Sequence, residues 1–95
     1  MSTLPDADIR AELATLPGWA GDGDTISKEY TFDGFTDAIG FVDRVATRAE
    51  AANHHPDLEN HYSRVRVALH TWTENAVTDK DLSLAREIEA VAGTA

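Results

Sequence analysis

Two adjacent histidines followed by a proline, His54-His55-Pro56, are the residues of this chain whose types best suit chemistry. The ordinary pKa of a histidine side chain is about 6.5, so an imidazole can give and take protons near neutral pH. Two such side chains next to each other indicate acid/base chemistry that needs no cofactor. Taken alone, however, the tripeptide more often marks an ordinary exposed turn.

The proline places both histidines where a helix ends. Proline disfavours the α conformation at the preceding residue, so His55 should be non-helical and the helix before it should end near Asn53 or His54. Glu50 lies four residues before His54, which is one helical turn, so its carboxylate could orient an imidazole. On spacing alone, a solvated surface charge explains Glu50 equally well.

A longer pattern surrounds the pair: Glu50-x3-His54-His55-Pro56-x5-Tyr62-x9-Trp72-x8-Asp81. It resembles the signature of the pterin-4a-carbinolamine dehydratases, in which an acidic residue, a histidine pair, a proline, an aromatic residue, a histidine or tryptophan, and an aspartate recur at these intervals. The similarity covers most of the chain. It extends to Pro17-Gly18-Trp19, Phe32, Phe35, Phe41, Thr78, Lys80, Leu84 and Ala85.

This resemblance implies the dehydration of a 4a-hydroxytetrahydropterin to quinonoid dihydropterin and water, with the pterin as substrate and with neither cofactor nor metal. It implies His54 as the principal acid/base, His55 as the group that hydrogen-bonds and positions the substrate, and Glu50 as the orienting partner. Asn53 and the run His70-Thr71-Trp72-Thr73 match the positions that line the pterin pocket with the two histidines.

The chain departs from the commoner family pattern at Trp72, where many relatives carry a third histidine. An indole can stack or donate a hydrogen bond, but it cannot shuttle protons at pH 7. His70 lies two residues earlier, on the same face if the strand continues that far, and could partly restore the missing proton-transfer group. The competing interpretation is that His70 only fills the rim of a pocket.

Other members of the pattern have plainer interpretations. Asp81 stands at the third position of a predicted final helix, so we interpret it as a structural cap rather than a catalytic group. Trp19 and Tyr62 are expected to be core or interface aromatics, and Trp72 to be a wall for a flat pterin. His61 matches no position of the pattern and is expected on the surface.

A non-catalytic role is the alternative to the enzyme. Some members of the family act as dimerisation partners of a transcription factor, and others that lack the histidine pair assist the assembly of a carbon-fixing enzyme. The presence of Glu50, His54 and His55 favours the dehydratase over a binding module.

Composition excludes several other classes of function. Seventeen acidic residues face eight basic ones, for a net charge of -9, so electrostatic binding of nucleic acid or of anionic membranes is not expected. No apolar segment is long enough to span a membrane, and we expect a soluble, cytoplasmic protein. The absence of cysteine excludes a thiolate nucleophile, and the adjacent histidines point to opposite sides of an extended chain, which disfavours a shared metal ion.

The hydrophobic periodicity predicts one α+β domain over residues 1–95. Helices are predicted over 6–16, from Asp33 as N-cap to the histidines, and from the capping box Thr78-x-x-Asp81 onward. Strands are predicted from Trp19, and over 25–32, 58–62 and 65–69. The order α-β-β-α-β-β-α indicates a four-stranded antiparallel sheet with three helices packed on one face.

Strand edges of such a small domain need cover. We therefore expect a homodimer. The resemblance implies that the sheets of neighbouring subunits join, and it allows a homotetramer built from two dimers.

Overall fold

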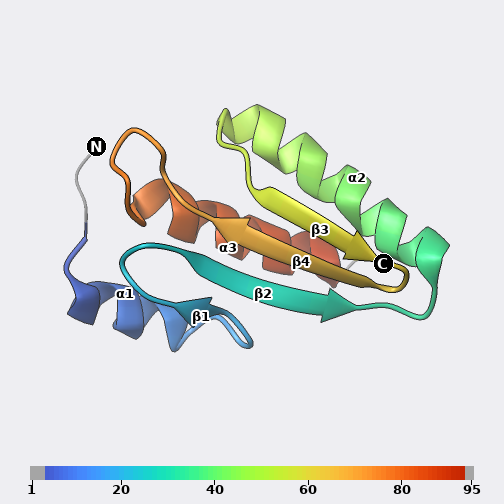
Figure 1. Cartoon of the computed structure of the whole chain (residues 1–95), viewed down its shortest axis with the longest axis horizontal. Coiled ribbons are helices and arrows are strands. Elements are labelled where there is room, and N and C mark those ends of the chain that lie inside the picture. The colour runs from blue at the N-terminus through green and yellow to red at the C-terminus, as the bar shows by residue number, and fades with distance from the viewer. Residues whose placement is uncertain (1–3, 94–95) are drawn as a thin grey trace.

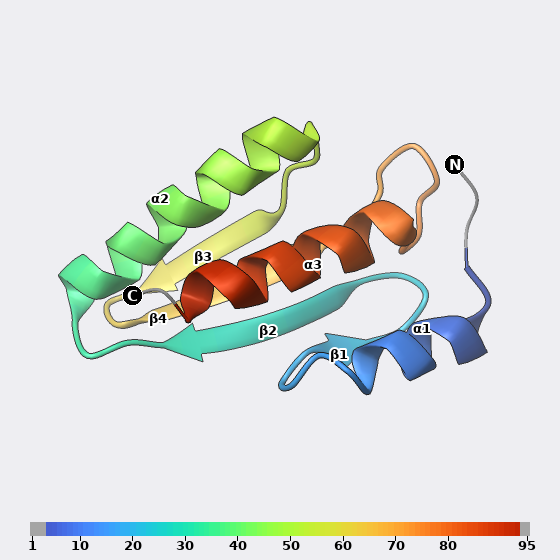
Figure 2. The ribbon, with the colours of Figure 1, turned by 180° about the vertical axis from the view of Figure 1, so that it is seen from behind.

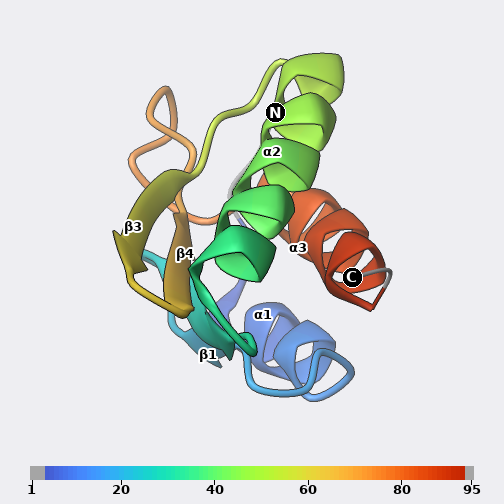
Figure 3. The ribbon, with the colours of Figure 1, turned by 90° about the vertical axis from the view of Figure 1, so that its right-hand side faces the viewer.

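The computed structural model describes residues 4–93. Its elements are α1 (Asp6–Leu13), β1 (Ala20–Gly21), β2 (Ile26–Thr31), α2 (Phe35–Ala52), β3 (Asp57–His61), β4 (Arg64–Leu69) and α3 (Asp79–Ala92). The four strands form one antiparallel sheet in the order β1-β2-β4-β3 (Figure 1). All three helices lie on one side of this sheet, as Figures 2 and 3 show from behind and from the side. The predicted α+β fold and the predicted order of elements are confirmed.

The first helix is shorter than predicted. Helix α1 ends at Leu13, because Thr15 and Leu16 donate their backbone hydrogen bonds to residues three positions earlier instead of four. Pro17 then disfavours the α conformation at Leu16. Leu16 is nevertheless buried, so the turn after α1 supplies the core contact that was expected from its last turn.

The start of α2 corrects a second prediction. Asp33 was expected to cap this helix, but the N-cap residue is Gly34, and no side chain caps the helix there. Asp33 lies one residue too early in the chain for its carboxylate to reach the first free backbone N–H groups of α2. The other end is as predicted, because α2 stops at Ala52 and Asn53 adopts a left-handed conformation with φ 50° and ψ 43°.

The core lies between the sheet and the helices. From β2 and β4 it receives alternate side chains, including Ile26, Tyr30, Val65 and Val67, all of them buried. Helices α2 and α3 contribute their apolar stripes to the same cluster: Ala38, Phe41, Val45, Leu82, Leu84, Ala85, Ile88 and Val91. Trp19 is also buried, as predicted, whereas Tyr62 is exposed at the turn between β3 and β4 and belongs to no core.

None of the helices in the described part of the chain is long and apolar enough to cross a membrane.

Candidate active site

The left-handed residue at the end of α2 sends the two histidines in different directions. Asn53 ends the helix with its backbone N–H on Glu50 O, and the next N–H, of His54, bonds to Ala49 O. This is the hydrogen-bond pattern of a helix C-terminus closed by a left-handed residue, for which asparagine is well suited. After it, His54 turns into the protein and is only 9% exposed, while the side chain of His55 is 59% exposed.

His54 is held by a buried carboxylate. Its Nε2 lies 2.5 Å from Oδ1 of Asp81, a residue with no exposed surface. The other oxygen of Asp81 accepts hydrogen bonds from Thr71 and Thr78. Since an aspartate carboxylate only accepts, Nε2 of His54 is assigned as the donor in this pair. The partner of His54 therefore comes from α3, 27 residues away in sequence.

The hydrogen bonds that lead from Thr78 and Thr71 to Asp81 all run in one direction. Thr71 Oγ1 donates to Asp81 Oδ2 at 2.7 Å, so the 2.8 Å contact between the two threonine hydroxyls has Thr78 as its donor. The backbone N–H of Lys80 then donates to Thr78 Oγ1. Such a chain of aligned hydrogen bonds reinforces itself in a low-dielectric interior. It fixes the position of the Asp81 carboxylate, and through it the ring of His54.

Asp81 therefore has two roles, of which only one was predicted. Its Oδ2 accepts a hydrogen bond from the backbone N–H of Thr78 at 2.9 Å, which completes the predicted capping box at the start of α3. Its contact with His54 was missed. No local spacing rule connects a helix cap to a histidine in another element, although the aspartate of the sequence pattern was a signal that pointed to the site.

Glu50 pairs with His55 and not with His54. Its Oε2 lies 2.5 Å from Nε2 of His55, and both side chains are exposed. The expected pairing of Glu50 with His54 assumed that the helix continues through residue 54. Because Asn53 breaks the helical geometry, His55 swings back over the last turn of α2 and takes this partner. Each histidine thus has its own carboxylate, and Nδ1 is the ring nitrogen not used in that pair.

Both histidines border one surface pocket of about 450 Å³. The other residues that line it come from the chain after α2, from the loop after β4 and from the start of α3: Asn53, Pro56, Asp57, Thr71, Trp72, Thr73 and Lys80. The pocket therefore brings together six of the seven residues that were predicted to bind substrate. The two histidines predicted to be catalytic are among these six. The six residues come from separate segments of the chain. Asp57 and Lys80 were not predicted to belong to the site.

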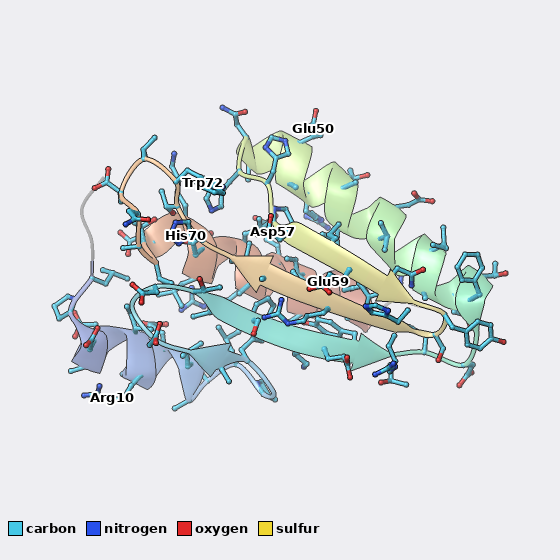
Figure 4. The ribbon with its side chains drawn as sticks, in the orientation of Figure 1. Arg10, Glu50, Asp57, Glu59, His70 and Trp72 are labelled. Atoms are coloured by element: carbon cyan, nitrogen blue, oxygen red, sulfur yellow. The ribbon has the colours of Figure 1, made fainter. Side chains whose placement is uncertain are left out.

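Trp72 and His70 lie side by side, but only Trp72 lines the pocket. Their rings meet edge to face, with centroids 5.5 Å apart, and Figure 4 shows both at the same end of the sheet. Strand β4 ends at Leu69, as the predicted range 65–69 has it, so the condition under which His70 and Trp72 would share a strand face is not met. His70 Nδ1 lies 2.5 Å from the carbonyl oxygen of Asp24. A carbonyl only accepts, so Nδ1 carries a hydrogen, and Nε2 is the ring nitrogen that this contact does not use.

The remaining predictions for single residues are easily placed. His61, at the end of β3, is exposed, as predicted, and lies 3.6 Å from Glu59. In residues 4–93 no group of three or more histidine, cysteine, aspartate or glutamate side chains is placed to hold a metal ion.

Comparison with known proteins shows the family of the chain. Residues 2–91 match the family described as pterin 4 alpha carbinolamine dehydratase. The chain belongs to this family. A protein of Mycobacteroides abscessus provisionally named as such a dehydratase is 44% identical, with 98% of this chain and 99% of the relative covered. One from Thermosynechococcus vestitus, also provisionally named, is 45% identical over 94% of both chains.

Solved structures agree with the fold. A transcriptional coactivator/pterin dehydratase from Brucella melitensis superimposes with a TM-score of 0.91 at 36% identity, over 97% of this chain and all of that one. A pterin dehydratase-like protein that is a RuBisCO assembly factor of the alpha-carboxysome superimposes with a TM-score of 0.67 at 21% identity, over 79% of this chain and 87% of that one. At that identity the second likeness concerns the fold alone.

Proposed function

We propose that the protein dehydrates 4a-hydroxytetrahydropterins to quinonoid dihydropterins and water. One observation supports this above the others: two imidazoles, each held by its own carboxylate, border the same pocket. A pocket with a prepared pair of proton carriers fits a reaction in which one proton is given and another is taken.

The reaction needs both kinds of proton transfer. The bond that breaks joins a hydroxyl oxygen to C4a of the pterin, and hydroxide is a poor leaving group. An imidazolium therefore donates a proton to the oxygen, so that water leaves. A neutral imidazole accepts the proton from N5, whose electron pair forms the new C4a–N5 double bond. Each positioned acid or base typically contributes about 10²- to 10⁴-fold to the rate.

His54 is proposed as the principal acid/base and His55 as the group that hydrogen-bonds and positions the substrate. Asp81 is a positioning residue for His54, because it fixes the ring through Nε2 and leaves Nδ1 for the substrate. Glu50 does the same for His55. Holding the rings before substrate arrives reduces the reorganisation that the reaction needs.

The rest of the pocket is proposed to bind the pterin. The indole of Trp72 is 78% exposed and offers a flat apolar surface to a flat heterocycle. Asn53, Thr71 and Thr73 supply polar groups around it. His70 is proposed to support Trp72 from behind, since their rings are in contact.

A binding module of the same fold is the second candidate. The solved relative described as a transcriptional coactivator/pterin dehydratase favours it. The two carboxylate-held histidines count against it, because a surface used only for docking has no need of such pairs.

Chemically prepared 4a-hydroxytetrahydropterin, followed by absorbance, tests the proposal directly. We expect the wild-type protein to accelerate dehydration, and His54→Ala or His55→Ala to lower the rate at least about tenfold while circular dichroism stays unchanged for His55→Ala. His61→Ala is the matched control, because His61 lies outside the pocket. Wild-type protein that gives no acceleration over buffer would exclude the dehydratase and favour the binding module.

A further inference from the structure

Asp57 is an acidic side chain of the pocket that the mechanism above does not use. It is the first residue of β3, exposed, and lines the same pocket as both histidines. Figure 4 shows it at the end of the sheet where Trp72 lies, with Glu59 further along the same strand. Within residues 4–93 no hydrogen bond or ion pair involves its carboxylate.

The register of the sheet explains why this carboxylate is unpaired. Asp57 and Glu59 point to the same face, because they are two residues apart on one strand. Glu59 lies opposite Arg66 and forms an ion pair with it at 3.3 Å. Asp57 lies opposite Ala68, which offers no charge. The register of the sheet therefore gives Glu59 a basic partner and gives Asp57, which borders the pocket, none.

A pterin carries a group that matches a free carboxylate. The edge of its pyrimidine ring presents the 2-amino group and N3–H side by side, so it offers two parallel donors. A carboxylate has two oxygens that accept in parallel, and charge-assisted pairs of this kind are among the stronger hydrogen bonds. C2 stands directly across the pyrimidine ring from C4a, so holding this edge directs the reacting carbon away from the anchor.

We infer that Asp57 is the residue that recognises the 2-amino and N3–H edge of the pterin. The inference rests on the proposed function and goes further, because it assigns the specificity for 2-aminopterins over 2-oxo analogues to one side chain. Lys80, the lysine of the pocket lining, forms no ion pair with Asp57, so the carboxylate is available to the ligand.

Direct binding measurements test this without turnover. The probes are 7,8-dihydropterin and 7,8-dihydrolumazine, which differ by an oxygen in place of the 2-amino group, and the affinity for each is measured by isothermal titration calorimetry. Wild-type protein should prefer dihydropterin by about tenfold or more, because a hydrogen bond to a charged group is worth about that factor. Asp57→Asn should weaken dihydropterin binding about tenfold and remove most of the preference.

Glu59→Gln is the matched control, with the same change of charge on the same strand and face but outside the pocket. It should leave both affinities as in wild type. In turnover assays Asp57→Asn should raise KM and leave kcat nearly unchanged, because the lost contact holds the substrate and not the reacting atoms.

The outcomes separate this inference from the proposed function. An unchanged preference in Asp57→Asn, or no binding of dihydropterin to wild type, would overturn the role of Asp57. Selective binding that depends on Asp57 but comes without turnover would support the inference and contradict the dehydratase. Turnover that does not depend on Asp57 would support the dehydratase and contradict the inference.

Discussion

His54 and His55 are neighbours in sequence, yet they occupy opposite environments. One is nearly buried against a carboxylate of α3, and the other is exposed beside a carboxylate of the preceding helix α2. Two identical side chains can therefore perform different parts of one reaction, since the differences lie in their partners and in their access to water.

Asp81→Asn should reduce both stability and activity. The amide cannot accept as many hydrogen bonds as the carboxylate, so donors of His54, Thr71 and Thr78 lose a partner. We expect unfolding to become easier by about 2 kcal/mol and the dehydration rate to fall about tenfold. Urea denaturation and the rate assay, done at a temperature where the variant is folded, measure the two effects.

Asp79→Asn is the control for this change, since it removes a charge from the same helical turn at an exposed position. A loss of stability in Asp81→Asn with a fully retained rate would reduce Asp81 to a helix cap.

The pair Trp72 and His70 is tested with a double-mutant cycle. Trp72→His should raise the rate or broaden the tolerance for the two hydroxyl stereoisomers, because an imidazole can transfer protons near neutral pH and an indole cannot. His70→Ala should slow the wild type and slow the Trp72→His variant much less. Rates of all four proteins with each stereoisomer give the coupling. Equal small effects of His70→Ala in both backgrounds would contradict the proposed support of Trp72 by His70.

At the scale of elements, one carboxylate joins three segments at the side of the core away from the histidines. Oε1 of Glu89 in α3 accepts hydrogen bonds from Trp19, Lys28 and Tyr30, at 3.1, 2.6 and 2.5 Å. Trp19 comes from the segment between α1 and β1, and the other two come from β2. This arrangement ties the C-terminal helix to β2 and to the segment before β1.

The stability of this junction should depend on pH. Burial opposes ionisation of Glu89, but the hydrogen bonds from Lys28 and Tyr30 and the charge of Lys28 outweigh it, so the pKa of Glu89 is lowered from 4.5. A lowered pKa means that the contribution to stability is complete above that ordinary value and is lost as the pH falls below it. The free energy of unfolding, measured from pH 6 down to 3, should therefore fall less steeply in Glu89→Gln than in wild type.

Glu87→Gln, at a half-buried position of the same helix where the carboxylate pairs only with Arg48 on the surface, should keep the wild-type slope. A wild-type slope in Glu89→Gln would show that other carboxylates dominate acid unfolding.

At alkaline pH the stability of the same junction changes in the opposite direction and falls as the pH rises. Burial, together with Glu89, raises the pKa of Tyr30, so the stabilising contribution of neutral Tyr30 declines as the pH rises above its ordinary value of 10.0.

Local sequence rules predicted what depends on neighbours along the chain. The end of α2 followed from Pro56, and the start of α3 followed from the Thr78-x-x-Asp81 spacing. They failed where the outcome depends on a single backbone angle or on distant contacts. Because Asn53 is left-handed, Glu50 pairs with His55 and not, as had been predicted, with His54. The contact between His54 and Asp81 exists only after α3 packs on the core.

For the whole molecule, β3 is the open edge of the sheet. All of its residues are exposed, and it has no strand on its outer side within the described chain. Apolar side chains lie exposed along and beside it: Leu58, Tyr62 and Phe35, the last two with stacked rings. An open edge with apolar flanks is a place where another chain can pair.

We predict that this edge is covered in a homodimer, with a homotetramer of two dimers as the larger assembly. Leu58→Lys places a charge on the edge strand and should shift the protein toward monomer. Light scattering at micromolar concentration, in low and high salt, measures the mass. Ser27→Lys in β2, where the strand pairs with β1 on one side and β4 on the other, is the control and should not change the mass. A wild-type monomer in both salts would contradict the prediction.

Local unfolding should affect the two histidines differently, because the carboxylate beside His54 belongs to α3 and the one beside His55 belongs to α2. Glu50 stays beside His55 as long as the last turn of α2 persists, whereas Asp81 stays beside His54 only while α3 is docked. Partial opening of a C-terminal helix costs less free energy than global unfolding. On mild heating the protein should therefore lose the ordered ring of His54 first, and inactivation should come before the loss of the sheet.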